Sequence, residues 1–487
     1  MKSKFHSAIS SSISKPKHTN RTMKSPKFLT GLLALAFASP AFGLTFEITG
    51  ATAFRRATIE SISALYAANG GTWRFVHNRA TAADYLNADF ITYEGTITGL
   101  PGTTVIRCAF NGSVEGLRAI AQPGSGDASY FKLSALTIPA TVAGANQFNV
   151  STSGNVETAQ AEMAFSDTDV SISPYAASSQ FGFGSSPGVV VFGLVVSEGC
   201  PISNVTTQQY NSLLKNGYVP LSNFTGVATD TSKVFCTGRN DGSGTRSSYL
   251  SEMGYGVANP VNQFLVVGSN GNQITALQKV PVNGTNDIDP LTAGVQLDPA
   301  TDIASFDQVP GGAFNQVTQL TTSLSTVWGQ NIAGNGGAFS GSVLRGHLAL
   351  DGDSVTVFDE DGYNLFGTPQ INIGMVSWIS LNDAVTARIN GATLAGFNGV
   401  SLAVTDADPE PGGTFIMTAA DKAKVYRGAY SAWNFQKFYY RTGSSAETVT
   451  LYNSIFTSVA SNLGAAGLKN IDMKVGRTDD GGIINPF

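Results

Sequence analysis

Residues 104–121, TVIRCAFNGSVEGLRAIA, indicate the fold class of this chain. The first seven residues predict a strand, Asn111-Gly112 predicts a turn, and 114–121 predicts a helix. The same order appears earlier, with a strand at 46–49 and a helix at 55–69. Strands that alternate with helices form α/β folds with mostly parallel sheets, and ligands bind at the carboxyl ends of such strands. We therefore expect ligand-binding residues in the turns that follow these strands.

The seven residues from Arg239 to Thr245, RNDGSGT, predict an anion-binding site. They form a turn that opens a helix, whose N-terminus offers free backbone N–H groups and the positive end of the helix dipole. Gly242 and Gly244 let a ligand approach these N–H groups closely. Ser243 and Thr245 add hydroxyl donors, and Arg239 adds a planar guanidinium that fits a tetrahedral oxyanion. The alternative is an ordinary Asp/Gly turn followed by a helix cap.

Three shorter segments precede this loop: TGATAF at 49–54, GSVEG at 112–116 and FSD at 165–167. Together with 239–245 they resemble the periplasmic phosphate-binding proteins of ABC transporters, the PstS-like proteins. In that family a Thr, a Gly-Ser-x-x-Gly turn, a Ser-Asp turn and an Arg-x-Asp-Gly-Ser-Gly-Thr loop follow in this order. The last loop matches position for position and is the specific part of the resemblance. The resemblance covers most of 44–250 in patches.

The resemblance implies a phosphate site whose ligands come from all four segments: Thr52, Ala53, Ser113, Asp167, Arg239, Asp241, Ser243, Gly244 and Thr245. Ala53 would contribute only its backbone N–H, and Asp241 would orient Arg239 and cap the helix. Asp167 would accept a proton that phosphate carries and sulfate lacks at neutral pH, so that its carboxylate rejects sulfate. Taken alone, SDTD at 166–169 is typical of a turn, which is the alternative for Asp167.

The resemblance also implies a two-lobed α/β fold of the type II periplasmic-binding-protein class, with mixed, mostly parallel sheets flanked by helices. The apolar run 188–196, GVVVFGLVV, would carry the chain from lobe one into lobe two. The stretch 371–378, INIGMVSW, would be the returning strand. We therefore expect lobe one to combine 44–196 with 373–487 and lobe two to span 197–372.

Two features depart from the family pattern. Arg55 and Arg56 follow Phe54, where the family has Pro and small residues. We expect Arg56 on a solvated face, whereas Arg55 either shares that face or adds charge to the anion site. The stretches 123–158 and 270–341, rich in Gly, Ser, Thr, Asn and Ala, are expected as surface insertions.

The N-terminus has the pattern of a Sec-type signal peptide. Lys24 and Lys27 precede the apolar run 28–37, FLTGLLALAF, and small residues follow up to Gly43, after which we expect cleavage. The run is too short to span a bilayer, and no later segment is apolar for long enough to do so. Residues 1–43 are therefore expected to be removed, and the mature chain to be periplasmic, secreted or on the cell surface.

Export would expose Cys108, Cys200 and Cys236 to an oxidising compartment. Three cysteines allow at most one internal disulfide. Cys200 and Cys236 flank the helical segment before the anion loop and are the better pair. Three buried free thiols are the alternative.

Composition narrows the function classes. The net charge of −5, without a basic cluster, argues against nucleic acid. Outside the targeting segment only His77 and His347 remain, and neither lies in an HExxH or HxH context, so no metal or cofactor is expected. We expect a solute-binding protein, not an enzyme, that holds inorganic phosphate or a similar oxyanion in an interlobe cleft for uptake by a membrane ABC permease. The alternatives are a cell-surface or secreted structural or adhesion protein with this fold and no transport role, and a secreted phosphohydrolase.

Overall fold

The computed structural model describes residues 43–71, 73–79, 82–131, 145–147, 156–240, 242–280, 337–338, 341–359, 363–403, 417–463 and 468–487. They belong to one unit, Ala41–Phe487. The expected signal peptide up to residue 42 lies outside the described residues, as do 132–144, 148–155 and 281–336 of the two expected insertions. Within the described ranges, no helix combines the length and the hydropathy that a membrane span requires.

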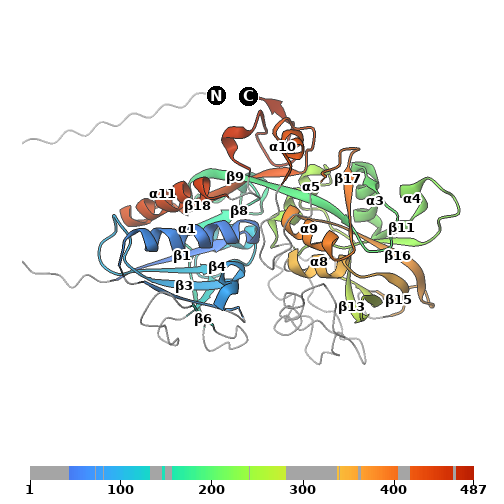
Figure 1. The fold of residues 1–487 in the computed structure, drawn as a ribbon, viewed down its shortest axis with the longest axis horizontal. Coiled ribbons are helices and arrows are strands. Elements are labelled where there is room, and N and C mark those ends of the chain that lie inside the picture. Colours follow the sequence, from blue (N-terminus) through green and yellow to red (C-terminus); the bar gives the residue numbers. More distant parts are fainter. Residues whose placement is uncertain are drawn as a thin grey trace, which may run out of the picture. The chain divides into compact units, whose positions relative to one another are not determined.

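The strands of the main sheet come from the whole length of the described chain. They are β1 (Leu44–Gly50), β2 (Arg74–His77), β3 (Phe90–Gly95), β4 (Thr104–Ala109), β6 (Ala145–Gln147), β8 (Met163–Ser166), β9 (Phe181–Val196), β13 (Phe264–Asn270), β14 (Gln273–Lys279), β15 (Gly352–Phe358), β16 (Gln370–Ser380) and β18 (Trp433–Arg441). Their order in the sheet is β13-β14-β15-β16-β9-β18-β8-β1-β4-β3-β2-β6 (Figure 1).

Shorter strands of the same sheet pair off this path: β10 (Asn204–Val205) with β17 (Thr393–Phe397), and β11 (Tyr218–Pro220) with β12 (Lys233–Cys236). Two separate two-stranded sheets are formed by β5 (Ala128–Phe131) with β7 (Val156–Ala159), and by β19 (Val475–Gly476) with β20 (Asn485–Pro486). In addition, β17 pairs with β9 and β12 pairs with β16.

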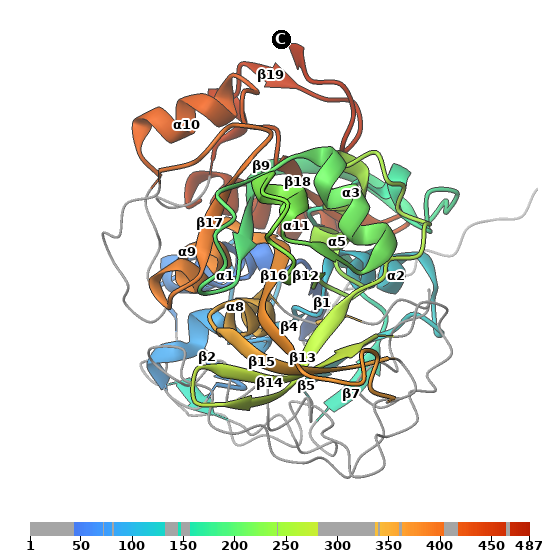
Figure 2. The ribbon, with the colours of Figure 1, turned by 90° about the vertical axis from the view of Figure 1, so that its right-hand side faces the viewer.

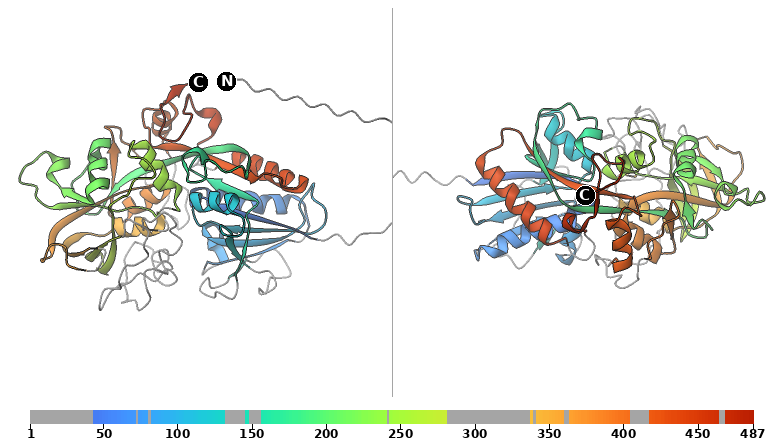
Figure 3. Two further views of the ribbon diagram at one scale, coloured as in Figure 1. Left: turned by 180° about the vertical axis from the view of Figure 1, so that it is seen from behind. Right: turned by 90° about the horizontal axis from the view of Figure 1, so that it is seen from above.

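The described helices flank the sheet. They are α1 (Arg55–Ala68), α2 (Ser113–Ala121), α3 (Thr207–Asn216), α4 (Ser222–Thr225), α5 (Gly244–Glu252), α8 (Gly341–Leu348), α9 (Leu381–Ile389), α10 (Ala419–Tyr426) and α11 (Ala446–Ser461), with 3-10 turns η1 (Thr52–Phe54), η2 (Ala82–Asn87), η5 (Val170–Ile172) and η6 (Asn470–Asp472). Figure 2 shows α8 and α9 on one side of β16, and α3 and α5 on the other. Figure 3 shows α11 beside α1.

Three parallel strands end at one edge of the sheet. β1 lies between β4 and β8 and is parallel to both, with Thr49 opposite Ala109 and Gly50 opposite Phe165. Because their carboxyl ends meet, the turns that follow them lie close together. These turns contain Thr52, Ser113 and Asp167, as expected for α/β sheets.

The strand β9 belongs to two neighbourhoods. Its first part pairs antiparallel with β18, and its last part, 192–196, pairs antiparallel with β16 and β17. β18 also pairs with β8 and so lies between β8 and β9. The expected strand 371–378 lies in β16, which pairs with the last part of β9, and β18 is the strand that pairs with β8 on this side.

An aromatic stack fixes β8, the strand that precedes Asp167. The rings of Phe165 and Phe438 are stacked with centroids 4.0 Å apart, and Phe438 stacks on Tyr452 of α11 at 4.5 Å. All three side chains are buried. This packing ties β8, β18 and α11 together, so the position of the Asp167 turn depends on residues near the C-terminus.

The α/β class and the sheet flanked by helices are confirmed. The expected helices at 55–69 and 114–121 correspond to α1 and α2, and the expected strands at 46–49, 104–110 and 188–196 lie in β1, β4 and β9. The sheet is mixed: parallel pairing surrounds β1, whereas β9, β16 and β18 pair antiparallel with one another. Cys108, Cys200 and Cys236 are free thiols, so Cys200 and Cys236 do not form the expected disulfide; Cys108 and Cys236 are buried, and Cys200 is partly exposed.

Candidate anion-binding site

Backbone hydrogen bonds join the turns after β1, β4 and β8. The Gly112 N–H donates to Gly50 O at 3.0 Å, and the Ala51 N–H donates to Phe165 O at 2.8 Å. Thr52 and Ala53 follow Ala51 directly in η1. Residues from three separate parts of the chain therefore reach the same edge of the sheet.

The loop that begins at Arg239 lies against the second of these turns. Gly242 O accepts hydrogen bonds from Val114 N at 3.1 Å and Glu115 N at 3.3 Å, in the first turn of α2. Ser243 is the N-cap residue of α5, and its side chain makes no capping hydrogen bond. The predicted helix after the RNDGSGT loop is thus observed, and its N-terminus faces the end of the sheet.

Gly244 lies in direct contact with Ser113 and Asp167. A Cβ at this position would overlap Asp167 Oδ1 and would lie 2.5 Å from Ser113 Cβ and 2.6 Å from Ser113 Oγ. Only glycine allows this close approach. The first turn of α5 and the two turns from the sheet therefore form one cluster.

Asp167 is the buried acid of this cluster. The hydroxyl of Ser113 donates to Asp167 Oδ1, and the Asp167 N–H donates to Ser113 Oγ at 3.2 Å. The side chain of Thr245 also acts to lower the pKa of this carboxyl group. Burial raises the pKa of Asp167, while the hydrogen bond from Ser113 and the charge of Arg239 act in the opposite direction.

Arg239 is the buried base of the cluster. Only 3% of the residue is exposed, and its Nε donates to Ala338 O at 3.0 Å. Burial lowers the pKa of Arg239 to about 10, and the charges of Asp167 and Asp383 oppose that shift. The guanidinium therefore stays charged at neutral pH and can supply charge-assisted hydrogen bonds to an anion.

Asp383 also acts on Arg239, and no sequence motif marks it as part of the site. This residue lies in the first turn of α9, where Arg345 Nη1 contacts its Oδ1 at 3.1 Å and Ser380 Oγ donates to its Oδ2 at 2.8 Å. The Ser-x-x-Asp spacing of Ser380 and Asp383 could have predicted a helix cap. It could not have shown that the carboxylate acts on Arg239, because the two residues are far apart in the sequence.

Three further residues near the predicted anion loop and the first turn were expected at or beside the site. Asp241 lies outside the described residues. Arg55 forms an ion pair with Asp89, and its charge acts on Arg239, which favours the interpretation that it lies near the anion site. Arg56 pairs with Glu60 at 3.1 Å on a partly exposed face of α1, as expected.

The cluster has the parts that a desolvated oxyanion needs. Hydrogen-bond donors are available from hydroxyls, from the N–H groups at the start of α5 and from a buried guanidinium. One buried carboxylate can accept a hydrogen bond from a protonated ligand. In the part of the chain that the structure describes, no group of three His, Cys, Asp or Glu side chains is arranged to hold a metal ion. The donor set suits an anion that carries a proton.

No protein-family model matches the chain, and no curated protein matches it in sequence. The chain is similar to solved structures of phosphate-binding proteins. An ABC-type phosphate transport receptor from Vibrio cholerae is 11% identical, with 85% of this chain and 93% of that chain covered and a TM-score of 0.36. The PstS protein of Borrelia burgdorferi is 11% identical, with 88% and 100% covered and a TM-score of 0.33.

A human phosphate-binding apolipoprotein is 12% identical, with 87% of this chain and 90% of that chain covered and a TM-score of 0.35. At such identities and TM-scores the likeness assigns no function by itself, so the function rests on the residues of this chain.

Proposed function

We propose that this chain is an exported solute-binding protein that holds inorganic phosphate, or a closely similar oxyanion, between the start of α5 and the turns after β1, β4 and β8. The observation that carries the proposal is the close approach of Gly244 to Ser113 and Asp167 beside the buried Arg239. The proposed ligand residues are Thr52, Ala53, Ser113, Asp167, Arg239, Asp241, Ser243, Gly244 and Thr245.

In this proposal Arg239 and the N–H groups of α5 neutralise the anion, and Asp167 selects for its proton. A buried carboxylate repels a fully deprotonated oxyanion such as sulfate, because the lone pairs of both would face each other. A ligand that carries a proton replaces this repulsion with a hydrogen bond. Phosphate and arsenate meet this requirement near neutral pH, whereas sulfate does not.

We further propose that the site lies between two lobes, which close on the ligand and open to release it. The neighbourhood of β1 would form one lobe and that of β16 the other, with β9 and β18 as the connecting strands. We therefore propose that the chain re-enters lobe one at β18 and not near residue 373, because β16 pairs with the last part of β9. Delivery of the ligand to a membrane ABC permease, and export to the periplasm or the cell surface, complete the proposed role.

Calorimetry of the purified mature chain with phosphate, arsenate, sulfate and molybdate tests the ligand. We expect phosphate and arsenate to bind and sulfate to bind much more weakly. Absence of phosphate binding would refute the proposal, as would release of product from a chromogenic phosphomonoester, which would favour the phosphohydrolase. Binding without any change in the radius of gyration would favour the structural or adhesion role over transport.

A further inference from the structure

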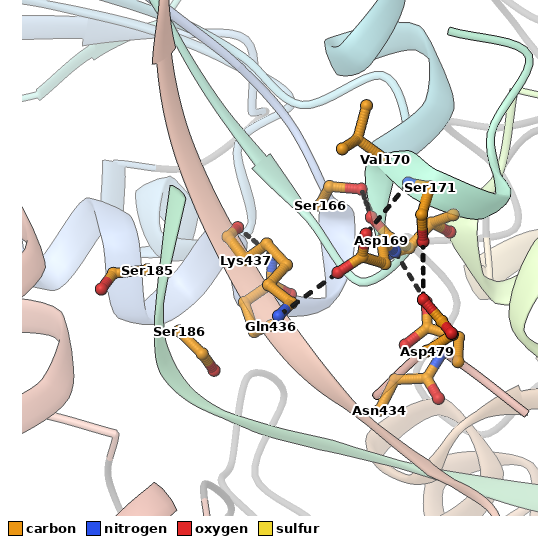
Figure 4. Close-up of polar contacts among 12 residues, drawn as sticks. Ser166, Asp169, Val170, Ser171, Ser185, Ser186, Asn434, Gln436, Lys437 and Asp479 are labelled. Atoms are coloured by element: carbon orange, nitrogen blue, oxygen red, sulfur yellow. Dashed lines mark hydrogen bonds and ion pairs between the residues drawn. The ribbon is translucent and has the colours of Figure 1, made fainter. Parts of the chain in front are cut away.

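The end of the chain contacts both segments that carry the candidate site. Residues 477–481, RTDDG, follow β19, and we name them the C-terminal strap. Figure 4 shows Asp479 of the strap beside Asp169 and Ser171, in the turn that follows Asp167.

The strap holds the turn at Asp169 through a buried carboxylate. Asp480 Oδ2 accepts a hydrogen bond from the Asp169 N–H at 2.7 Å, and only 6% of Asp480 is exposed. The exposed Asp479 accepts a bond from Ser171 Oγ at 3.1 Å. The Asp169 carboxylate in turn pairs with Lys437 Nζ of β18 at 3.3 Å (Figure 4). Asp480 is thus the buried anchor of this contact.

The strap also packs on the C-terminal end of α5. Arg477 Nη1 pairs with Glu252 Oε2 at 2.7 Å, and Arg477 Nη2 donates to Ser431 O at 2.8 Å. The guanidinium lies 4.3 Å from the centre of the Trp433 ring. At Gly481, where φ is +70°, a Cβ would overlap the carbonyl of Ser251. The other end of α5 carries Ser243, Gly244 and Thr245, so the strap holds the helix that presents the proposed anion donors.

Hydrogen bonds between α5 and the Asp167 turn connect the two segments that the strap contacts. Asp167 O accepts hydrogen bonds from Ser248 Oγ of α5 at 3.3 Å and from Asn434 Nδ2 at 3.1 Å. Asn434 Nδ2 also donates to Ser248 Oγ at 2.6 Å. The middle of α5 is therefore bonded directly to the Asp167 turn, and the strap joins the continuation of that turn to the end of the helix.

We propose that the C-terminal strap positions the Asp167 turn against α5, and that Asp480 is the positioning residue through which pH changes the affinity of the site for its anion. This inference rests on the proposed function for its ligand. The arrangement of the strap itself rests only on the contacts above.

The surroundings of Asp480 give the direction of the pH effect. Burial raises the pKa of Asp480 to about 7, and the charge of Asp169 adds to this, while the Asp169 N–H, Lys437 and Arg477 act in the opposite direction. The other charged or titratable groups at this place are Asp479, Glu252 and Tyr439. The docked strap raises the pKa of Asp480 from its ordinary value of about 4 to about 7, so docking is strongest below pH 4, weakens as pH rises from 4 toward 7 and changes little above pH 7.

The test compares phosphate binding by the mature wild-type chain, Asp480→Asn and the matched control Asp479→Asn between pH 5.5 and pH 8.5. The comparison cancels the titration of phosphate itself and of Asp167. We expect the ratio of the wild-type Kd to the Asp480→Asn Kd to rise by on the order of tenfold between pH 5.5 and pH 7. Between pH 7 and pH 8.5 the ratio should level off, and the control should show no such rise. A ratio that stays constant with pH would overturn the proposed role of Asp480.

Hydrogen exchange without phosphate separates a failure of the strap from a failure of the proposed function. At pH 8.5 the amides of 167–173 and 248–253 should exchange several-fold faster in Arg477→Lys than in the wild-type chain, since lysine cannot keep both bonds of the guanidinium. They should exchange more slowly in Asp480→Asn. If the wild type binds no phosphate, the proposed function fails, and unchanged exchange in both variants would then refute the strap as well.

Discussion

Gly244→Ala is the most direct perturbation of the candidate site. The added Cβ would overlap Asp167 Oδ1 and press on Ser113, so the Asp167 turn and the start of α5 would have to separate. The substitution changes no charge and removes no hydrogen-bonding group. In an ordinary helix, alanine in place of glycine would be stabilising.

The magnitude follows from the packing. A Cβ placed 2.5 Å from Ser113 Cβ is well inside the normal contact distance of about 3.5 to 4 Å, so the cluster must move by roughly 1 Å. Overpacking of this kind costs about 1 to 3 kcal/mol. If the full cost falls on the closed, ligand-bound arrangement, the affinity for phosphate drops by about 5- to 150-fold.

Calorimetry with phosphate, together with thermal unfolding, measures both consequences. Gly70→Ala is the control, because an added Cβ at Gly70 has no neighbouring atom within 4 Å and only the positive φ of +66° opposes the substitution. This control should lose about 1 kcal/mol of stability and no affinity. Wild-type affinity in Gly244→Ala would refute the assignment of the start of α5 to the site.

Four further outcomes are expected. Arg239→Ala should lose oxyanion binding, because each charge-assisted hydrogen bond contributes about 1.5 to 3 kcal/mol; near-native affinity in calorimetry would contradict this. Asp167→Asn should narrow the preference for phosphate over sulfate, since an amide can donate to sulfate, and a wild-type chain that binds both equally would show the role to be wrong. Saturating phosphate should reduce the radius of gyration in small-angle scattering and raise the melting temperature; no change in either would exclude closure. Burial lowers the pKa of His347 to about 3. Below pH 6.5 this histidine is protonated in the unfolded chain but stays neutral in the folded chain, so the free energy of unfolding falls as pH drops from 6.5 toward 3. Urea unfolding at pH 7.5 and pH 5 should show a smaller loss in His347→Phe, and an equal loss would disprove this account.

Local elements of the fold were predictable because their signals are local. The stretch 104–110 marked β4, a continuous apolar run marked the last part of β9, and the RNDGSGT loop marked the start of α5. The first part of β9, 181–187, is rich in Gly and Ser, and it is a strand because β18 pairs with it. Nothing in its own composition indicates this, since glycine weakens strands.

For the candidate site, the sequence motifs predicted individual residues but not the contacts between them. The sequence names Ser113, Asp167 and Gly244 but gives no reason for their contact, which depends on parallel pairing around β1. It gives no sign that Asp383 acts on Arg239 or that Asp480 holds Asp169. Such relations arise from tertiary packing between distant segments, and periodicity within a short window cannot report them.

The position of β18 between β8 and β9 affects how the protein is made. β8 and β9 leave the ribosome one after the other, yet the strand that pairs with both comes from 433–441. Until those residues emerge, both facing edges stay open, and exposed edges invite pairing with other chains. The nascent chain therefore cannot complete this part of its sheet before residues 433–441 have been synthesised. This delay suits the export that we propose, because the chain would stay unfolded during translocation, and it exposes strand edges that holdase chaperones can bind.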